Sequence, residues 1–76
     1  MDDRLAAQLA AARAVVRARF PELAAVEPSV SHQADGGAVF AFRGRFRAAD
    51  GVELMRLVRV TVDDRGNVVK VSASRG

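Results

Sequence analysis

The residues best suited to chemistry in this sequence are three arginines at alternate positions, Arg43, Arg45 and Arg47. Residues two apart on a β-strand share one face, and guanidinium groups form planar, bidentate hydrogen bonds with carboxylates and phosphates. The spacing therefore predicts a basic sheet face that attracts an acidic protein or phosphate groups. The alternative interpretation is an outer face kept charged and solvated, which prevents aggregation.

Other reactive side chains are sparse. The chain contains one histidine, His32, and no cysteine, which excludes thiolate nucleophiles, disulfides and cysteine metal sites. It has no recognisable Ser-His-Asp spacing, carboxylate pair or glycine-rich phosphate loop. The aspartates at positions 35, 50, 63 and 64 lie in glycine-containing segments and are interpreted as turn residues. We therefore expect no enzyme activity, no metal and no cofactor.

The length and composition indicate one small domain over residues 1–76. Half of the residues are apolar and 28% are charged, which is typical of a globular chain. The 12 basic residues outnumber the 9 acidic ones, and Lys70 is the only basic residue that is not arginine. No apolar run is long enough to span a bilayer, and the acidic start Met1-Asp2-Asp3 is unlike a secretory signal. We expect a cytoplasmic protein.

The first third of the chain has helical periodicity. Apolar residues recur at steps of three and four, which predicts an amphipathic helix from Asp3 to about Arg19. The residues of this stripe are Leu5, Leu9, Ala12, Val16 and Phe20. Pro21 disfavours helical backbone at the residue before it and should end the helix there. The segment 21–26 is compatible with one further helical turn.

After Pro28 the hydrophobic period changes to two, and glycine-containing turns separate the alternating segments. The pattern predicts strands near 28–34, 38–48, 52–62 and 67–74, the first being the least apolar. The expected architecture is an α+β two-layer sandwich, in which the N-terminal helix packs across an antiparallel meander of three to four strands. This element order, together with the Val-Asp-x-x-Gly-x-Val-Val turn at 62–69, resembles the cystatin-like folds and the small PepSY-type domains. No functional residue is carried over from that resemblance.

Turn chemistry and burial together predict the register of the strands. A three-residue loop at 49–51 pairs Ala48 with Val52 and makes one face almost wholly apolar. The opposed pairs are then Phe46 and Leu54, Phe42 and Val58, and Phe40 and Val60. A loop at 35–37 sets Val30 opposite Phe42 and His32 beside Phe40, and a four-residue loop at 63–66 sets Val60 against Val69 and Val58 against Val71. The expected inner face therefore includes Val30, Val69 and Val71.

Arg56 does not fit this pattern, because it falls on the apolar face opposite Gly44. An unpaired charge there would be costly. Either a bulge near Met55 rotates Arg56 outward, or its stem extends past the end of the helix toward Glu22 or Glu27.

The outward face combines cations with aliphatic residues, a pattern typical of a protein-binding surface. We expect a non-enzymatic interaction module that either self-associates, for example as a homodimer, or binds an acidic protein partner through this face. The alternative is non-specific nucleic-acid binding by the same arginines; the absence of Trp and Tyr argues against sequence-specific recognition. The partner-binding residues we predict are Arg43, Arg45, Arg47, Arg59, Met55, Leu57 and Lys70.

Overall fold

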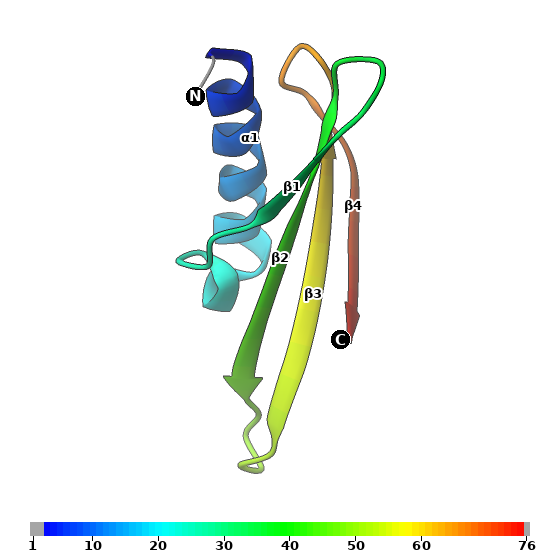
Figure 1. Cartoon of the computed structure of the whole chain (residues 1–76). Coiled ribbons are helices and arrows are strands. Elements are labelled where there is room, and N and C mark those ends of the chain that lie inside the picture. The colour runs from blue at the N-terminus through cyan, green and yellow to red at the C-terminus, as the bar shows by residue number, and fades with distance from the viewer. Residues whose placement is uncertain (1–2, 76) are drawn as a thin grey trace.

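The computed structural model describes residues 3–75 and shows the expected α+β fold, with one helix packed against a four-stranded antiparallel sheet (Figure 1). Helix α1 spans Asp3–Arg19 and is followed by a 3₁₀ helix, η1, over Pro21–Leu23. The strands are β1 (Ser29–His32), β2 (Ala38–Arg47), β3 (Glu53–Val62) and β4 (Val68–Arg75). Their order in the sheet is β1-β2-β3-β4, so every strand pairs with its neighbour in the sequence.

The helix and the further turn form where the sequence predicts them. Ala12 and Val16 are fully buried, and Leu5, Leu9 and Phe20 pack around the same core. The helix ends at Arg19, directly before the Phe20-Pro21 step, and η1 is shorter than the predicted segment 21–26. No helix among residues 3–75 is long and apolar enough to cross a membrane.

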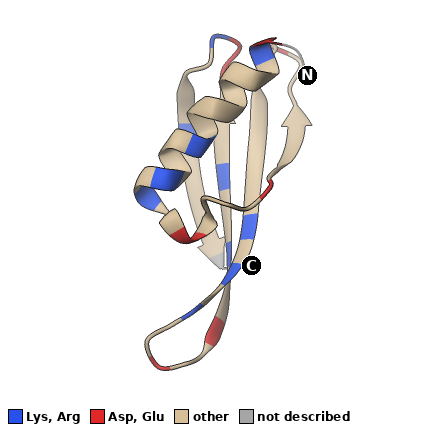
Figure 2. Ribbon diagram, turned by 90° about the vertical axis from the view of Figure 1, so that its left-hand side faces the viewer, with Lys and Arg blue, Asp and Glu red and all other residues tan. Residues whose placement is uncertain are grey.

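The core lies between α1 and the inner face of the sheet. It consists of Phe40 and Phe42 of β2, Val58, Val60 and Val62 of β3, and the buried residues Ala12, Val16, Leu23 and Ala38. Figure 2 shows α1 lying across the sheet while the hairpin of β2 and β3 extends beyond it. The molecule is accordingly elongated, at 42 × 19 × 18 Å, whereas a helix of 17 residues is about 25 Å long.

The predicted register is confirmed for β2 and β3. Phe46 lies opposite Leu54, Phe42 opposite Val58, and Phe40 opposite Val60. The Ala48 N–H donates to the Val52 carbonyl at 2.9 Å, and Gly51 adopts a φ of 85°. The loop is therefore the predicted three-residue turn with glycine in the left-handed position.

The other two hairpins use the same turn, and this makes the predicted registers of β1 and β4 wrong. The first loop is residues 34–36, with Gly36 at a φ of 90°, so Val30 lies opposite Phe40 rather than Phe42. His32 consequently lies opposite Ala38, not beside Phe40. The shift is two residues, so Val30 keeps its predicted side of the sheet, where 38% of it remains exposed.

In the third hairpin the loop is residues 64–66, one residue shorter than predicted. Val68 therefore lies opposite Val62, and a bulge beside Thr61 then moves the register by one more residue. Val69 occupies the irregular position and is 61% exposed, which contradicts its predicted inward orientation. Val71 does pack against the core, but opposite Val60 rather than Val58.

Candidate functional site

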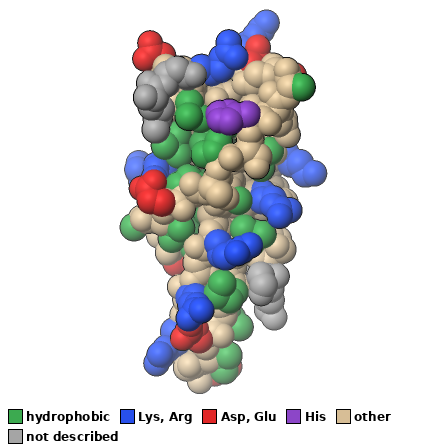
Figure 3. All heavy atoms as spheres, viewed as in Figure 1, with side chains coloured by type: hydrophobic (Ala, Val, Ile, Leu, Met, Phe, Trp, Pro, Cys, Tyr) green, Lys and Arg blue, Asp and Glu red, His purple; other side chains and the backbone are tan. Residues whose placement is uncertain are grey.

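The outer face of the sheet, on the side opposite α1, carries all seven residues of the predicted partner-binding set. Buried and exposed residues alternate along β2, with Phe42 buried and Arg43 exposed. Arg45, Arg47, Arg59 and Lys70 are likewise exposed, while Met55 and Leu57 are half-buried between them. Figure 3 shows basic side chains spaced along the strands toward the hairpin end, with hydrophobic side chains between them (Figure 3).

Cross-strand pairing brings each cation of β2 beside a defined residue of β3. Arg43 lies opposite Leu57, Arg45 opposite Met55, and Arg47 opposite Glu53. Side chains at directly opposed positions on one face are about 5 Å apart, which is close enough for the aliphatic stems to pack together. The outer face is thus a row of guanidinium groups over an aliphatic centre.

Glu53 is the acidic residue among these outer-face cations. Its Oε1 lies 3.3 Å from Nη1 of Arg45, diagonally across the hairpin, and the two side chains are 53% and 72% exposed. An exposed pair of this kind contributes between 0 and about 1 kcal/mol. Arg43, Arg47, Arg59 and Lys70 make no ion pair with any residue in the described range 3–75. The positive charge of the face is therefore largely uncompensated.

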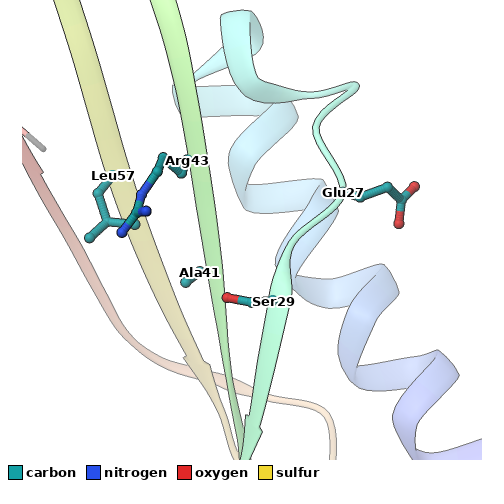
Figure 4. A pocket seen from close by; sticks show the side chains of 5 residues that line it. All are labelled: Glu27, Ser29, Ala41, Arg43 and Leu57. Carbon is teal, nitrogen blue, oxygen red and sulfur yellow. The ribbon is translucent and has the colours of Figure 1, made fainter.

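A shallow hollow of about 280 Å³ lies on this face, beside the first residue of β1, where β2 continues paired with β3 but not with β1. Figure 4 shows Arg43 beside Leu57, with Ala41 and Ser29 next to them, while Glu27 points away from the group (Figure 4). The Glu27 carboxylate instead accepts a hydrogen bond from Arg13 at 3.1 Å. The hollow is thus lined by one cation, by small and aliphatic groups, and by Glu27, whose carboxylate is directed toward Arg13 instead of Arg43.

Arg56 follows the second of its two predicted alternatives and does not join the basic face. It lies on the inner side opposite Gly44, and its Nη1 donates to Oε1 of Glu22 at 2.8 Å. Its guanidinium group also lies 4.8 Å from the ring centroid of Phe46 and 5.7 Å from that of Phe20. These cation-π contacts and the ion pair hold Arg56 at the end of the core.

Gln8 is an anchoring residue that was not among the predicted site residues. Its side chain is only 2% exposed, and its Nε2 donates to the carbonyls of Gly36 at 3.0 Å and Asp63 at 2.9 Å. One glutamine thus joins α1 to the turns of two hairpins. Gln8 is the only uncharged polar residue of α1 and lies on the apolar stripe, four positions before Ala12, which is a signal of burial. The sequence does not show its partners, because they are 28 and 55 positions away.

Three of the four predicted turn aspartates, Asp35, Asp50 and Asp63, accept hydrogen bonds within their turns. Oδ1 of Asp35 accepts the Gly37 N–H at 2.9 Å, and that of Asp50 accepts the Val52 N–H at 3.0 Å. The hydrogen bond that the Asn67 N–H donates to Oδ1 of Asp63, at 2.8 Å, lowers the pKa of Asp63 below its usual 3.8. Desolvation raises this pKa, and the N–H of Arg65 lowers it further. Within residues 3–75 no three acidic or histidine side chains gather as a set of metal ligands.

A search of protein families, curated proteins and solved structures finds no match to this chain. The resemblance in element order to cystatin-like and PepSY-type domains therefore brings no site residue to it. His32, the sole histidine, lies exposed in β1 opposite Ala38. The interpretation of the surface rests on its own geometry.

Proposed function

We propose that this protein is a non-enzymatic interaction module that binds an acidic protein partner through the outer face of its sheet. The observation that carries the proposal is the row of Arg43, Arg45 and Arg47 over the half-buried Met55 and Leu57. Exposed cations around an apolar centre are typical of an interface in which charge sets orientation and the centre loses water.

Charge favours an acidic partner over a second copy of the chain. A two-fold symmetric dimer places the same surface patch on both subunits. Five cations would then face five cations, with one carboxylate, Glu53, on each side. Like charges brought together across an interface cost several kcal/mol. An acidic partner turns the same charges into attraction.

The chemistry of the face favours a protein over a nucleic acid. Sheet surfaces that bind single strands use exposed aromatic rings for base stacking. The four phenylalanines of this chain all lie toward the helix side, where Phe40 and Phe42 are fully buried and Phe20 and Phe46 contact Arg56. The outer face offers aliphatic side chains instead, which suit the desolvated centre of a protein interface.

The test uses a fluorescein-labelled 12-residue peptide of alternating Glu and Leu as the acidic probe, titrated by fluorescence anisotropy. We expect Arg43→Glu combined with Arg45→Glu to weaken binding at least about tenfold, equivalent to about 1.4 kcal/mol. The matched control is Arg17→Glu with Arg65→Glu, which changes the net charge equally at exposed positions away from the face. Equal weakening by both pairs would contradict the proposal, because only the total charge would then matter.

A second pair of variants tests the apolar centre. Leu57→Glu places a carboxylate in the middle of the outer face, whereas Val69→Glu makes the same change at a position that is 61% exposed on β4. We expect the first variant to abolish peptide binding and the second to change it little, with both remaining folded by circular dichroism. If both bind like the wild type, the face is not the binding site.

Two other outcomes would favour the remaining alternatives. A wild-type protein that sediments as a dimer, with Leu57→Glu as a folded monomer, would favour self-association. A single-stranded 12-nucleotide DNA that binds more tightly than the peptide, with steep salt dependence and sensitivity to Arg43→Ala plus Arg45→Ala, would favour non-specific nucleic-acid binding. No binding of that DNA at low salt would exclude the latter.

A further inference from the structure

The edge of β2 next to the arginine row is unpaired over its second half. β1 pairs with β2 only from His32 opposite Ala38 to Ser29 opposite Ala41, whereas β2 continues to Arg47. No other strand among residues 3–75 lies on that side, since the sheet order begins with β1. About five residues, or roughly 17 Å of strand, therefore form an open edge.

The turn between β2 and β3 decides which backbone groups point toward this edge. In an antiparallel ladder, successive residues bond alternately to one side and to the other. The bond from Ala48 N–H to Val52 C=O directs the even-numbered residues of β2, such as Gly44 and Phe46, toward β3. The N–H and C=O groups of Arg43, Arg45 and Arg47 consequently point toward the open edge.

The preceding segment of the chain is held away from the edge. Arg13 of α1 holds the connection, donating to the carbonyls of Ala24 at 3.3 Å and Val26 at 3.4 Å, and to the Glu27 carboxylate. The residues before β1 are therefore bound to the helix side rather than paired with β2.

The other open edge of the sheet, along β4, lacks a comparable charge row. It begins at the bulge beside Thr61, and bulges disfavour the addition of a further strand. The outer-face residues along it are Lys70, Ser72 and Ser74, of which one is charged. Within the described part of the chain, only the edge of β2 combines unpaired backbone with three cations.

We propose that the partner binds by strand addition, as an extended acidic segment that pairs antiparallel with β2 from Arg43 to Arg47. This inference rests on the proposed function and specifies its geometry. Main-chain hydrogen bonds to the open edge hold the segment, as in other proteins that bind peptides at a sheet edge. Alternate carboxylates of the segment then lie directly beside the three guanidinium groups, where opposite charges stabilise the cross-strand pair.

The surroundings of the edge fit such a segment on both faces. On the outer face, the hollow lined by Glu27, Ser29, Ala41, Arg43 and Leu57 leaves space beside Arg43 for the first acidic side chain, because the Glu27 carboxylate points away and is paired with Arg13. On the inner face, the half-buried Phe46, which contacts Arg56, would lie next to the intervening residues of the segment. An alternation of acidic and apolar residues is thus the sequence pattern that this edge selects.

Amide hydrogen exchange measured by NMR tests the open edge directly. In the free protein, the amides of Arg43, Arg45 and Arg47 should exchange at least tenfold faster than those of Gly44 and Phe46, which bond to β3. Adding the Glu-Leu peptide at saturation should slow the three arginine amides at least tenfold and leave the other two unchanged. Equal rates in the free protein, or arginine amides unaffected by the bound peptide, would overturn the proposal.

N-methylated peptides separate this inference from the proposed function. A residue opposite an edge-facing arginine exchanges both backbone hydrogen bonds with it, so methylating the Glu nitrogens removes the donors that strand addition needs. We expect that peptide to lose at least tenfold in affinity, and one methylated on the Leu nitrogens to bind nearly as the parent does. If both bind like the parent and Arg43→Glu with Arg45→Glu still weakens binding, the face is the site but strand addition is wrong.

Discussion

Replacing Gly44 by alanine tests the contact that joins the protruding hairpin to the body of the protein. A methyl group at Gly44 would overlap Cδ2 of Leu23, well inside the sum of the two van der Waals radii, and would lie 3.5 Å from Cγ2 of Val26. Leu23 is fully buried in the core and belongs to η1. The methyl group therefore has no space unless η1 moves away from β2.

The expected size of the effect follows from two opposing terms. Alanine in place of glycine inside a strand gains about 0.5–1 kcal/mol through backbone entropy. Forcing extra volume into a packed core costs about 1–3 kcal/mol, and Leu23 is enclosed on all sides. We expect a net destabilisation of about 1–2 kcal/mol, which lowers the midpoint temperature by roughly 4–16 °C in a domain of this size.

Urea denaturation followed by far-ultraviolet circular dichroism measures this change, and a double-mutant cycle with Leu23→Ala identifies its cause. Leu23→Ala alone should cost about 2–5 kcal/mol by leaving a cavity. In the double variant the methyl group of Gly44→Ala enters that cavity. The loss in free energy of unfolding of the double variant should therefore be smaller than the sum of the losses of the two single variants. Strictly additive losses, or a Gly44→Ala protein more stable than the wild type, would refute this account of the packing.

Three further changes probe the framework that positions the outer face. Gln8→Leu should cost about 1–3 kcal/mol in urea denaturation, because the part-buried Gly36 carbonyl loses its side-chain donor and the Asp63 carbonyl keeps only the Gly66 N–H; an unchanged midpoint would mean that water replaces the amide. Gly66→Ala should cost about 1–2 kcal/mol although no atom lies within 4 Å of the new methyl, since φ at Gly66 is +87°, and Gly66→Asn should cost less. Because the pKa of Asp63 is lowered from its usual 3.8, ionised Asp63 stabilises the fold above pH 3.8 and loses this effect as the pH falls below it. The difference in free energy of unfolding between the wild type and Asp63→Asn should therefore shrink below pH 3.8. A difference that does not depend on pH would contradict this prediction.

The sequence was sufficient to predict the helix, the pairing of β2 with β3 and the composition of the outer face. The spacing of Leu5, Leu9 and Val16 is compatible only with one helical face, and Pro21 marks the end of that helix. For β2 and β3, the turn at Gly51 and the burial of Phe42 require the same register. Two independent local signals agreed there, so Arg43 and its neighbours were correctly placed on the outer face.

Hydrophobic alternation alone could not place β1 or β4. A slip of two residues leaves every side chain on its predicted face, so the pattern does not distinguish Phe40 from Phe42 as the partner of Val30. In β4 the turn is one residue shorter than predicted and a bulge adds another offset, which leaves Val69 exposed. The bulge depends on how β4 packs along β3, and no residue type in the sequence predicts it.

The position of Arg56, the anchoring by Gln8 and the open edge of β2 were decided only by the tertiary structure. Arg56 is accommodated because Glu22, 34 positions away, reaches it across the end of the core. Gln8 is buried because two distant turns present carbonyls to it. The edge is open because Arg13 holds the connection to β1 against the helix. Each depends on contacts between residues far apart in the chain, whereas periodicity and turn chemistry report only on neighbours.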